Sequence, residues 1–209
     1  MEAAKAAAPK EFLISVIKDE QMLDHPSLST LVVSHPLIAL AAKYFGTVPM
    51  LSGVRLWWTP PNTSISESQL FHCDREDHRQ LKFLINVTEA TPDTGPFTLI
   101  PAGESERIKA ALGYSHKTYR LTDDEVFRVG APNEIITLTG PPGSVACVDT
   151  SRCLHYGSRN NSQPRLLLMV QFTDCLAPNV TLPKWHLGLS KLGLELDELQ
   201  RLTLGVSTG

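Results

Sequence analysis

The stretch LFHCDREDHRQLKFLINVT, residues 70–88, contains two short segments of alternating apolar and polar residues, separated by a charged run. Such alternation is typical of β-strands, in which successive side chains point to opposite faces. On a strand ending in FHCD, His72 and Asp74 share one face, and Phe71 and Cys73 share the other. An imidazole and a carboxylate on one face are two potential metal ligands. The stretch therefore predicts both a β fold and a candidate site.

Similar short segments along the chain favour a mainly β protein. They are rich in β-branched, aromatic or leucine residues, and Gly, Pro, Asn and Asp separate them. In sequence order they are MLSGVRLWWTP (50–60), GPFTLIPA (95–102), EIITLTG (134–140), SVACVDT (144–150) and RLLLMVQFTD (165–174). Six or more short strands after a helical start predict a β-sandwich or jelly roll with helices packed outside.

Four further segments predict helical structure. Apolar residues recur at helical spacing in residues 10–24 and 35–46, and Gly46 is the expected stop of the second helix. Residues 104–128 predict a helix followed by an irregular insertion, and residues 184–204 predict a terminal helix.

Length and charge limit the classes of function. The 209 residues predict a single domain with a helical N-terminal segment (1–50), a β core (51–175) and a helical tail (176–209). The net charge of −3 gives no reason to expect nucleic acid or an anionic membrane as partner. A secretory signal is not evident, and the longest apolar stretches are too short to span a bilayer. We therefore expect a cytoplasmic protein, either a monomer or a homodimer.

The cysteines point to the same compartment. None of the four cysteines forms a C-x-x-C pair, and a chain of 209 residues does not need disulfides to fold. Free thiols are favoured, although the even number leaves disulfides open.

A third metal ligand and a companion arginine occur later in the sequence. His155 precedes a turn-rich segment, and Arg165 begins an apolar strand ten residues further on. With His72 and Asp74, His155 would complete a set of two imidazoles and one carboxylate, which is typical of non-haem Fe(II) sites with open positions. Burying a guanidinium such as that of Arg165 without a partner costs free energy, and a bound carboxylate ligand would accept hydrogen bonds from two of its nitrogens.

These residues resemble a known family. HCD at 72–74, TGPFTLIPAGES at 94–105 and HYGSRNNSQPR at 155–165 are similar to motifs of the Fe(II)/2-oxoglutarate oxygenases, within them the phytanoyl-CoA dioxygenase-like group. The resemblance extends over roughly residues 51–172. It implies a double-stranded β-helix, a cupin-like jelly roll with one open end.

The resemblance also implies a reaction. His72, Asp74 and His155 would bind Fe(II), and Arg165 would hold the distal carboxylate of 2-oxoglutarate. O2 would oxidise a small organic substrate, with hydroxylation as the default outcome, while 2-oxoglutarate becomes succinate and CO2. Halogenases of the family replace the carboxylate ligand by a small residue, so the presence of Asp74 disfavours halogenation.

Two features depart from the family pattern. Ala102 and Gly103 stand where Gly-Ser is usual, and Glu104 and Ser105 stand where a histidine would follow. The segment before the triad is also short, which suggests an open active site or one that a partner covers. Both departures leave the substrate undefined, but neither removes an iron ligand.

Secondary candidates depend on which way each strand faces. If Lys82 and Asn86 face the interior, they would help to hold a 2-oxoglutarate carboxylate, and Thr98 is a similar candidate; the opposite orientation would place Lys82 in water. Arg55 and Trp57 are candidates for substrate binding. The alternative is that Arg55 is a solvated residue at the sheet edge and that Trp57 packs in the core. Gln69 is a further candidate for hydrogen bonding to a ligand or to the residues behind it.

Two other functions remain open. A cupin-like enzyme that does not use 2-oxoglutarate would share the fold and the metal, and Arg165 would then be structural. A binding module that has lost catalysis would agree with the altered 101–105 turn and the short N-terminal segment. Release of succinate during turnover separates the cupin-like enzyme from the oxygenase. Metal analysis and 2-oxoglutarate decarboxylation without added substrate test the binding module.

Overall fold

The computed structural model describes residues 10–75, 77–115, 119–129, 134–177, 185, 188–189 and 193–206. It is mainly β, with a five-stranded sheet in the order β1-β2-β8-β3-β6 and a three-stranded sheet in the order β5-β4-β7. The strands are β1 (Ile14–Ser15), β2 (Pro49–Thr59), β3 (Gln80–Asn86), β4 (Thr98–Leu99), β5 (Ile136–Thr137), β6 (Val145–Asp149), β7 (His155–Tyr156) and β8 (Arg165–Asp174). Every pairing between these strands is antiparallel.

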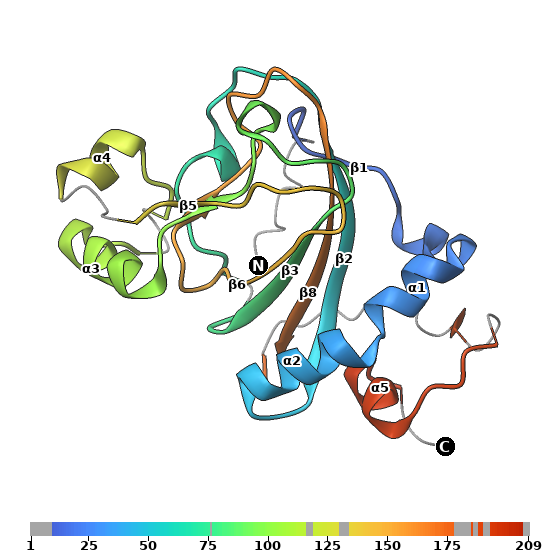
Figure 1. Cartoon of the computed structure of the whole chain (residues 1–209). Helices are drawn as coiled ribbons and strands as arrows, with labels where there is room; N and C mark the ends of the chain where they lie inside the picture. The colour runs from blue at the N-terminus through green and yellow to red at the C-terminus, as the bar shows by residue number, and fades with distance from the viewer. Residues whose placement is uncertain are drawn as a thin grey trace, which may run out of the picture.

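Helices flank the two sheets, as Figure 1 shows. The α-helices are α1 (Pro26–Val32), α2 (His35–Phe45), α3 (Ala102–Leu112), α4 (Asp123–Arg128) and α5 (Glu198–Thr203). Short 3-10 helices in the described residues include η1 (Asp19–Asp24), η2 (Glu67–Gln69) and η3 (Pro92–Thr94). In Figure 1, α1, α2 and α5 lie together on one side of β2 and β8, and α3 and α4 lie on the other side of the molecule.

Strand β8 organises the large sheet because it pairs with both long neighbours. Its register with β2 runs from Pro49↔Asp174 to Thr59↔Arg165, and β3 pairs along its other edge. Alternate side chains of β8 enter different layers. Val170 and Phe172 pack in the apolar cluster beneath the helices, whereas Leu167 packs in the cluster between the sheets. Arg165 lies on the inner face at the end of this strand.

The apolar cluster beneath the helices joins the large sheet to the N-terminal and C-terminal helices. It includes Phe83 from β3, Ile38 and Ala41 from α2, Val32 from α1, and Leu204 just after α5. All five side chains are buried, with at most 1% of their surface exposed. Apolar burial of this kind stabilises by about 25 cal/mol per Å2, so it is the main force that holds these helices on the sheet.

The predicted helix at residues 35–46 is confirmed. Helix α2 has Pro36 in its first turn, and it ends at Gly46, whose φ of 73° is the left-handed conformation that glycine adopts easily. Residues 26–45 have the length and hydropathy of a membrane span, and 33% of the apolar window is buried. The structure divides this stretch into α1 and α2, and each is too short to cross a hydrocarbon core of about 30 Å.

The predicted helix at residues 10–24 is wrong. Ile14 and Ser15 form strand β1, which pairs with Trp58 and Trp57 on β2, and only η1 follows it. An open strand edge satisfied the backbone of this segment better than its own helical hydrogen bonds, so the tertiary context prevailed over the local pattern.

Two further predictions need correction. Residues 70–74 do not form a regular strand, because Phe71 and His72 make only isolated bridges, to Leu121 and His155. The predicted terminal helix at 184–204 is reduced to α5, and much of the rest lies outside the described residues. Residues 104–128 do contain a helix and an irregular insertion, with α3 beginning directly after Pro101 and α4 closing the segment.

Candidate metal centre

Two histidines far apart in the sequence meet through their backbones. His72 and His155 form an antiparallel bridge, in which the His72 N–H donates to the His155 carbonyl at 3.0 Å and the reverse bond is 2.9 Å long. The Asp74 N–H donates to the Thr150 carbonyl at 2.9 Å, so the loop beyond His72 is anchored as well. Backbone pairing therefore sets the position of all three candidate ligands before any metal binds.

The donor atoms of this triad lie close enough to share one ion. Asp74 Oδ1 is 3.8 Å from His72 Nε2, and Asp74 Oδ2 is 3.7 Å from His155 Nε2. One ligand atom from each residue lies within 4.8 Å of the others. Atoms bound to one ion at about 2.1 Å lie at most about 4.2 Å apart, so small side-chain shifts would close the site.

Both imidazoles direct the same nitrogen to the site. His72 Nδ1 lies 2.8 Å from the Leu70 carbonyl, and His155 Nδ1 lies 2.9 Å from the Cys153 carbonyl. A carbonyl only accepts, so each Nδ1 carries the proton and donates, and each Nε2 keeps a free lone pair. The ring of Phe97 stacks on His155 at 4.9 Å and fixes its plane.

Burial sets the charge of the triad. It lowers the pKa of His155 to about 3 and also lowers the pKa of His72, so both rings are neutral at pH 7. Burial alone would raise the pKa of Asp74, but the Lys82 ammonium beside it holds that pKa well below its usual range. Two neutral imidazoles and one carboxylate are the ligand set of a non-haem ferrous site.

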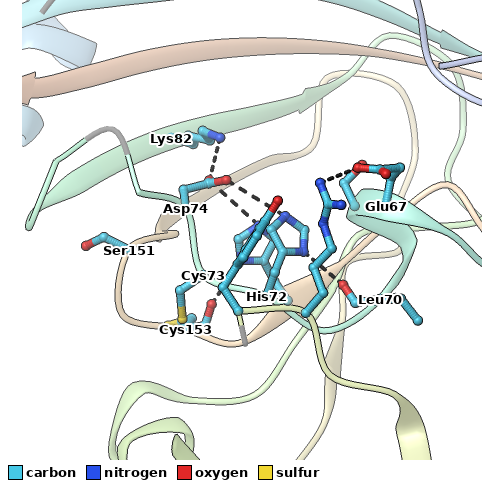
Figure 2. Close-up of polar contacts among 12 residues, drawn as sticks. Glu67, Leu70, His72, Cys73, Asp74, Lys82, Ser151 and Cys153 are labelled. Carbon is cyan, nitrogen blue, oxygen red and sulfur yellow. Dashed lines mark hydrogen bonds and ion pairs between the residues drawn. The ribbon is translucent and has the colours of Figure 1, made fainter. Parts of the chain in front are cut away.

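Lys82 faces inward, which resolves the orientation that the sequence left open. Its Nζ lies 2.6 Å from Asp74 Oδ2, and Figure 2 shows Lys82, Asp74 and His72 converging. Asn86 lies on the same face of β3, donates to the Gly140 carbonyl at 3.3 Å, and lines a small cavity of about 110 Å3 that it shares with Arg165.

Arg165 is a buried cation without a carboxylate partner among the described residues. Only 3% of its surface is exposed, its Nε has no hydrogen-bond partner within the described part of the chain, and a terminal nitrogen lies 3.5 Å from Ser158 Oγ. Burial lowers its pKa to about 10, so it stays charged at pH 7. An uncompensated buried charge is costly, and an anionic ligand would offset that cost.

One cavity of about 380 Å3 contains both the triad and Arg165. Trp57 and Arg55 also line it, as do Lys82 and Phe97. Since β2 carries Arg55 and Trp57 on its inner face, the two substrate candidates do reach the cavity.

Thr98 and Gln69 have other partners. The Thr98 hydroxyl donates to the Pro96 carbonyl at 3.3 Å, and the Gln69 side-chain amide donates to the Ser158 carbonyl at 2.6 Å. Neither is among the described residues that line the cavities. Their assignment to ligand binding stays a prediction.

Sequence reasoning did not assign several residues of the cavity, among them Phe97, Ser158 and Lys10. Phe97 and Ser158 lie inside the segments 94–105 and 155–165, so those motifs contained the available signal. Lys10 also lines the cavity, although it precedes His72 by 62 positions, and nothing in its local sequence indicated this.

Comparison with known proteins gives structural matches alone, because no family model and no curated protein matches the chain. EctD from S. alaskensis, crystallised with 2-oxoglutarate and 5-hydroxyectoine, matches 78% of this chain with 20% identity and a TM-score of 0.56. AviO1 from Streptomyces viridochromogenes Tue57 matches 86% of this chain with 19% identity and a TM-score of 0.54. The epimerase SnoN, in complex with Fe3+, alpha ketoglutarate and nogalamycin RO, matches 78% with 13% identity and a TM-score of 0.52.

The matches differ in how much of each neighbour they include. This chain spans 57% of the EctD chain, 74% of the AviO1 chain and 62% of the SnoN chain. At identities of 13 to 20% the likeness concerns the fold. The resemblance expected from the sequence is confirmed at that level: this chain has the antiparallel jelly-roll fold of the iron- and 2-oxoglutarate-dependent oxygenases.

Proposed function

We propose that this protein is a non-haem Fe(II)- and 2-oxoglutarate-dependent dioxygenase that hydroxylates a small organic molecule and releases succinate and CO2. The observation that carries the proposal is the pairing, in one cavity, of a His–Asp–His triad with a buried arginine that has no carboxylate partner in the described structure. The fold, shared with proteins crystallised with iron and 2-oxoglutarate, supports it.

The residues of the triad fit a ferrous ion. His72 and His155 would each offer Nε2, and Asp74 would offer a carboxylate oxygen, which leaves coordination positions open. Bound Fe(II) would supply the activation of O2 that none of the amino-acid side chains provides. Lys82 holds Asp74 Oδ2, so it would keep that carboxylate ionised and oriented toward the metal.

Arg165 gives the cavity its selectivity for a keto acid. Its planar fork suits a carboxylate bound through two parallel hydrogen bonds, and a dicarboxylate could reach both the triad and this guanidinium. Ser158 Oγ, 3.5 Å from the same guanidinium, would help to fix it. Arg55 and Trp57 line the same cavity and would contact the substrate, and Asn86 would support the Arg165 end.

The test has two readouts. Anaerobic addition of Fe(II) and 2-oxoglutarate to the protein should produce the visible charge-transfer band of the chelate, and Asp74→Ala should abolish it. Calorimetric titration should show that Arg165→Gln weakens 2-oxoglutarate binding, whereas Arg107→Gln, at an exposed position of α3, does not. Bound iron without a band, or equal binding to Arg165→Gln, would contradict the proposal.

Hydroxylation is a more specific claim than the use of Fe(II) and 2-oxoglutarate. The fold also includes the epimerase SnoN, so the outcome has to be measured on the product. Mass spectrometry of a turned-over substrate should find one added oxygen atom for each succinate. A product with unchanged composition would retain the oxygenase machinery and replace hydroxylation by another reaction.

A further inference from the structure

A second, more open depression adjoins the metal cavity. Its volume is about 490 Å3, and its lining comprises Lys10, Ser68, His72, Cys73, Asp74, Arg75 and Arg120. Lys10, Ser68, His72 and Asp74 belong to the linings of both spaces. His72 and Asp74 of the triad therefore lie at the junction, whereas His155 and Arg165 line the metal cavity and not this outer depression.

The outer depression is strongly cationic. Three of its lining residues, Lys10, Arg75 and Arg120, carry positive charges, although the whole chain has a net charge of −3. The carboxylate in this lining is Asp74, which Lys82 already neutralises. A concave surface lined by charges of one sign concentrates counter-ions, so this depression attracts anions.

The cations are held close together by contacts with the protein. The guanidinium carbons of Arg75 and Arg120 lie 3.6 and 4.7 Å from the centre of the same Tyr119 ring. Lys10 Nζ lies 2.9 Å from Ser68 Oγ, and burial, followed by the charge of Arg120, lowers the pKa of Lys10. The effect of Arg120 on Lys10 is a repulsion between like charges, and a bound anion would offset the free energy that it costs.

Arg120 contributes positive charge to the depression. It forms an ion pair with Glu67, which lies outside the described lining of the depression. Its Nε is buried and has no hydrogen-bond partner within the described part of the chain. This N–H is therefore enclosed by the protein, and Arg120 would act on an anion in the depression through the positive charge of its guanidinium.

We propose that the outer depression binds the anionic group, phosphate or carboxylate, of the substrate, and thereby places the carbon to be oxidised beside the triad. The assignment of the anion to a substrate rests on the proposed function, whereas the anion site itself does not. In this arrangement the cavity has separate places for two anions. Arg165 serves the keto acid, and Lys10 with Arg120 serves the substrate.

Calorimetric titration of the metal-free protein with inorganic phosphate tests this site without iron, oxygen or 2-oxoglutarate. Lys10→Gln and Arg120→Gln should each weaken phosphate binding about tenfold, because each removes one positive charge beside the anion. Two matched variants should leave it within about twofold: Arg107→Gln, which removes another guanidinium paired with a glutamate, and Arg128→Gln, which removes an exposed cation of α4. Arg165→Gln is titrated beside them to test whether phosphate occupies the inner cation instead. Thermal unfolding of each variant confirms that it is folded.

The outcomes separate this inference from the proposed function. Loss of phosphate binding in Lys10→Gln and Arg120→Gln, with the two matched variants unchanged, supports the anion site even if no iron or keto acid binds. Equal binding in all variants, or loss only in Arg165→Gln, overturns it even if the oxygenase activity is established. A parallel titration with acetate shows which anion the site prefers, since the stronger binding of the two identifies the group.

Discussion

Replacing Arg165 by methionine should have opposite effects on the free protein and on the ligand-bound protein. The guanidinium is 3% exposed and lacks a carboxylate partner among the described residues. Burial lowers its pKa from 12.5 to about 10. That difference corresponds to about 3 kcal/mol of cost for keeping the charge in the folded protein at pH 7. Methionine has a similar length and no charge, so we expect Arg165→Met to be about 1–3 kcal/mol more stable without ligand.

With 2-oxoglutarate bound, the wild type should gain more stability than Arg165→Met. A 2-oxoglutarate concentration about 100 times its dissociation constant should stabilise the wild type by about 2.7 kcal/mol, while Arg165→Met loses most of this gain. Urea unfolding of the Fe(II)-loaded protein without oxygen, with and without 2-oxoglutarate, measures both effects.

Arg159→Met is the matched control, because Arg159 is 8% exposed and its fork binds both oxygens of Asp123 at 2.9 and 3.1 Å. A buried arginine with a partner should lose stability on the same change, and 2-oxoglutarate should still bind. The reasoning would be refuted if Arg165→Met were less stable than the wild type without ligand and 2-oxoglutarate stabilised both proteins equally.

Three further predictions concern the triad and its supporting turns. Asp74→Asn should remove the stabilisation by Fe(II), about 2.7 kcal/mol at 100 times the dissociation constant, whereas Asp93→Asn at an exposed position of η3 should keep it; thermal unfolding under anaerobic conditions measures both. The pKa of His155 is lower in the folded protein, about 3 against 6.5, so the unfolded chain takes up a proton first and the metal-free protein should lose stability as the pH falls from 6.5 toward 3. Urea unfolding at several pH values should show that the free energy of unfolding depends less on pH in His155→Gln than in the wild type. An identical pH dependence would count against a buried neutral imidazole. Gly95→Ala should destabilise by about 1–3 kcal/mol, since Gly95 has a φ of +63° and an added Cβ would lie 3.1 Å from Asn161 Cβ, whereas Gly103→Ala in α3 meets nothing within 4 Å and should stabilise slightly in the same denaturation assay.

The sequence by itself determined the parts of the fold that depend on local pattern. The long strands β2, β3 and β8 and the helix α2 with its Gly46 stop were predictable, because each carries its own periodicity or capping residue. The triad was predictable from residue types and motif order, and His72, Asp74 and His155 do converge. The helix expected at residues 10–24 is wrong because part of that segment pairs with β2 as strand β1, and residues 70–74 make isolated bridges instead of a regular strand.

Only the tertiary structure decided which polar groups have partners. Arg159 and Arg165 look alike in the sequence, yet one meets Asp123 and the other ends in a cavity beside the triad. The inward face of Lys82 and the approach of Lys10 to the metal cavity were also set there. The physical reason is that periodicity depends on neighbours a few positions away, whereas burial and charge pairing depend on distances between segments that the chain brings together only when it folds.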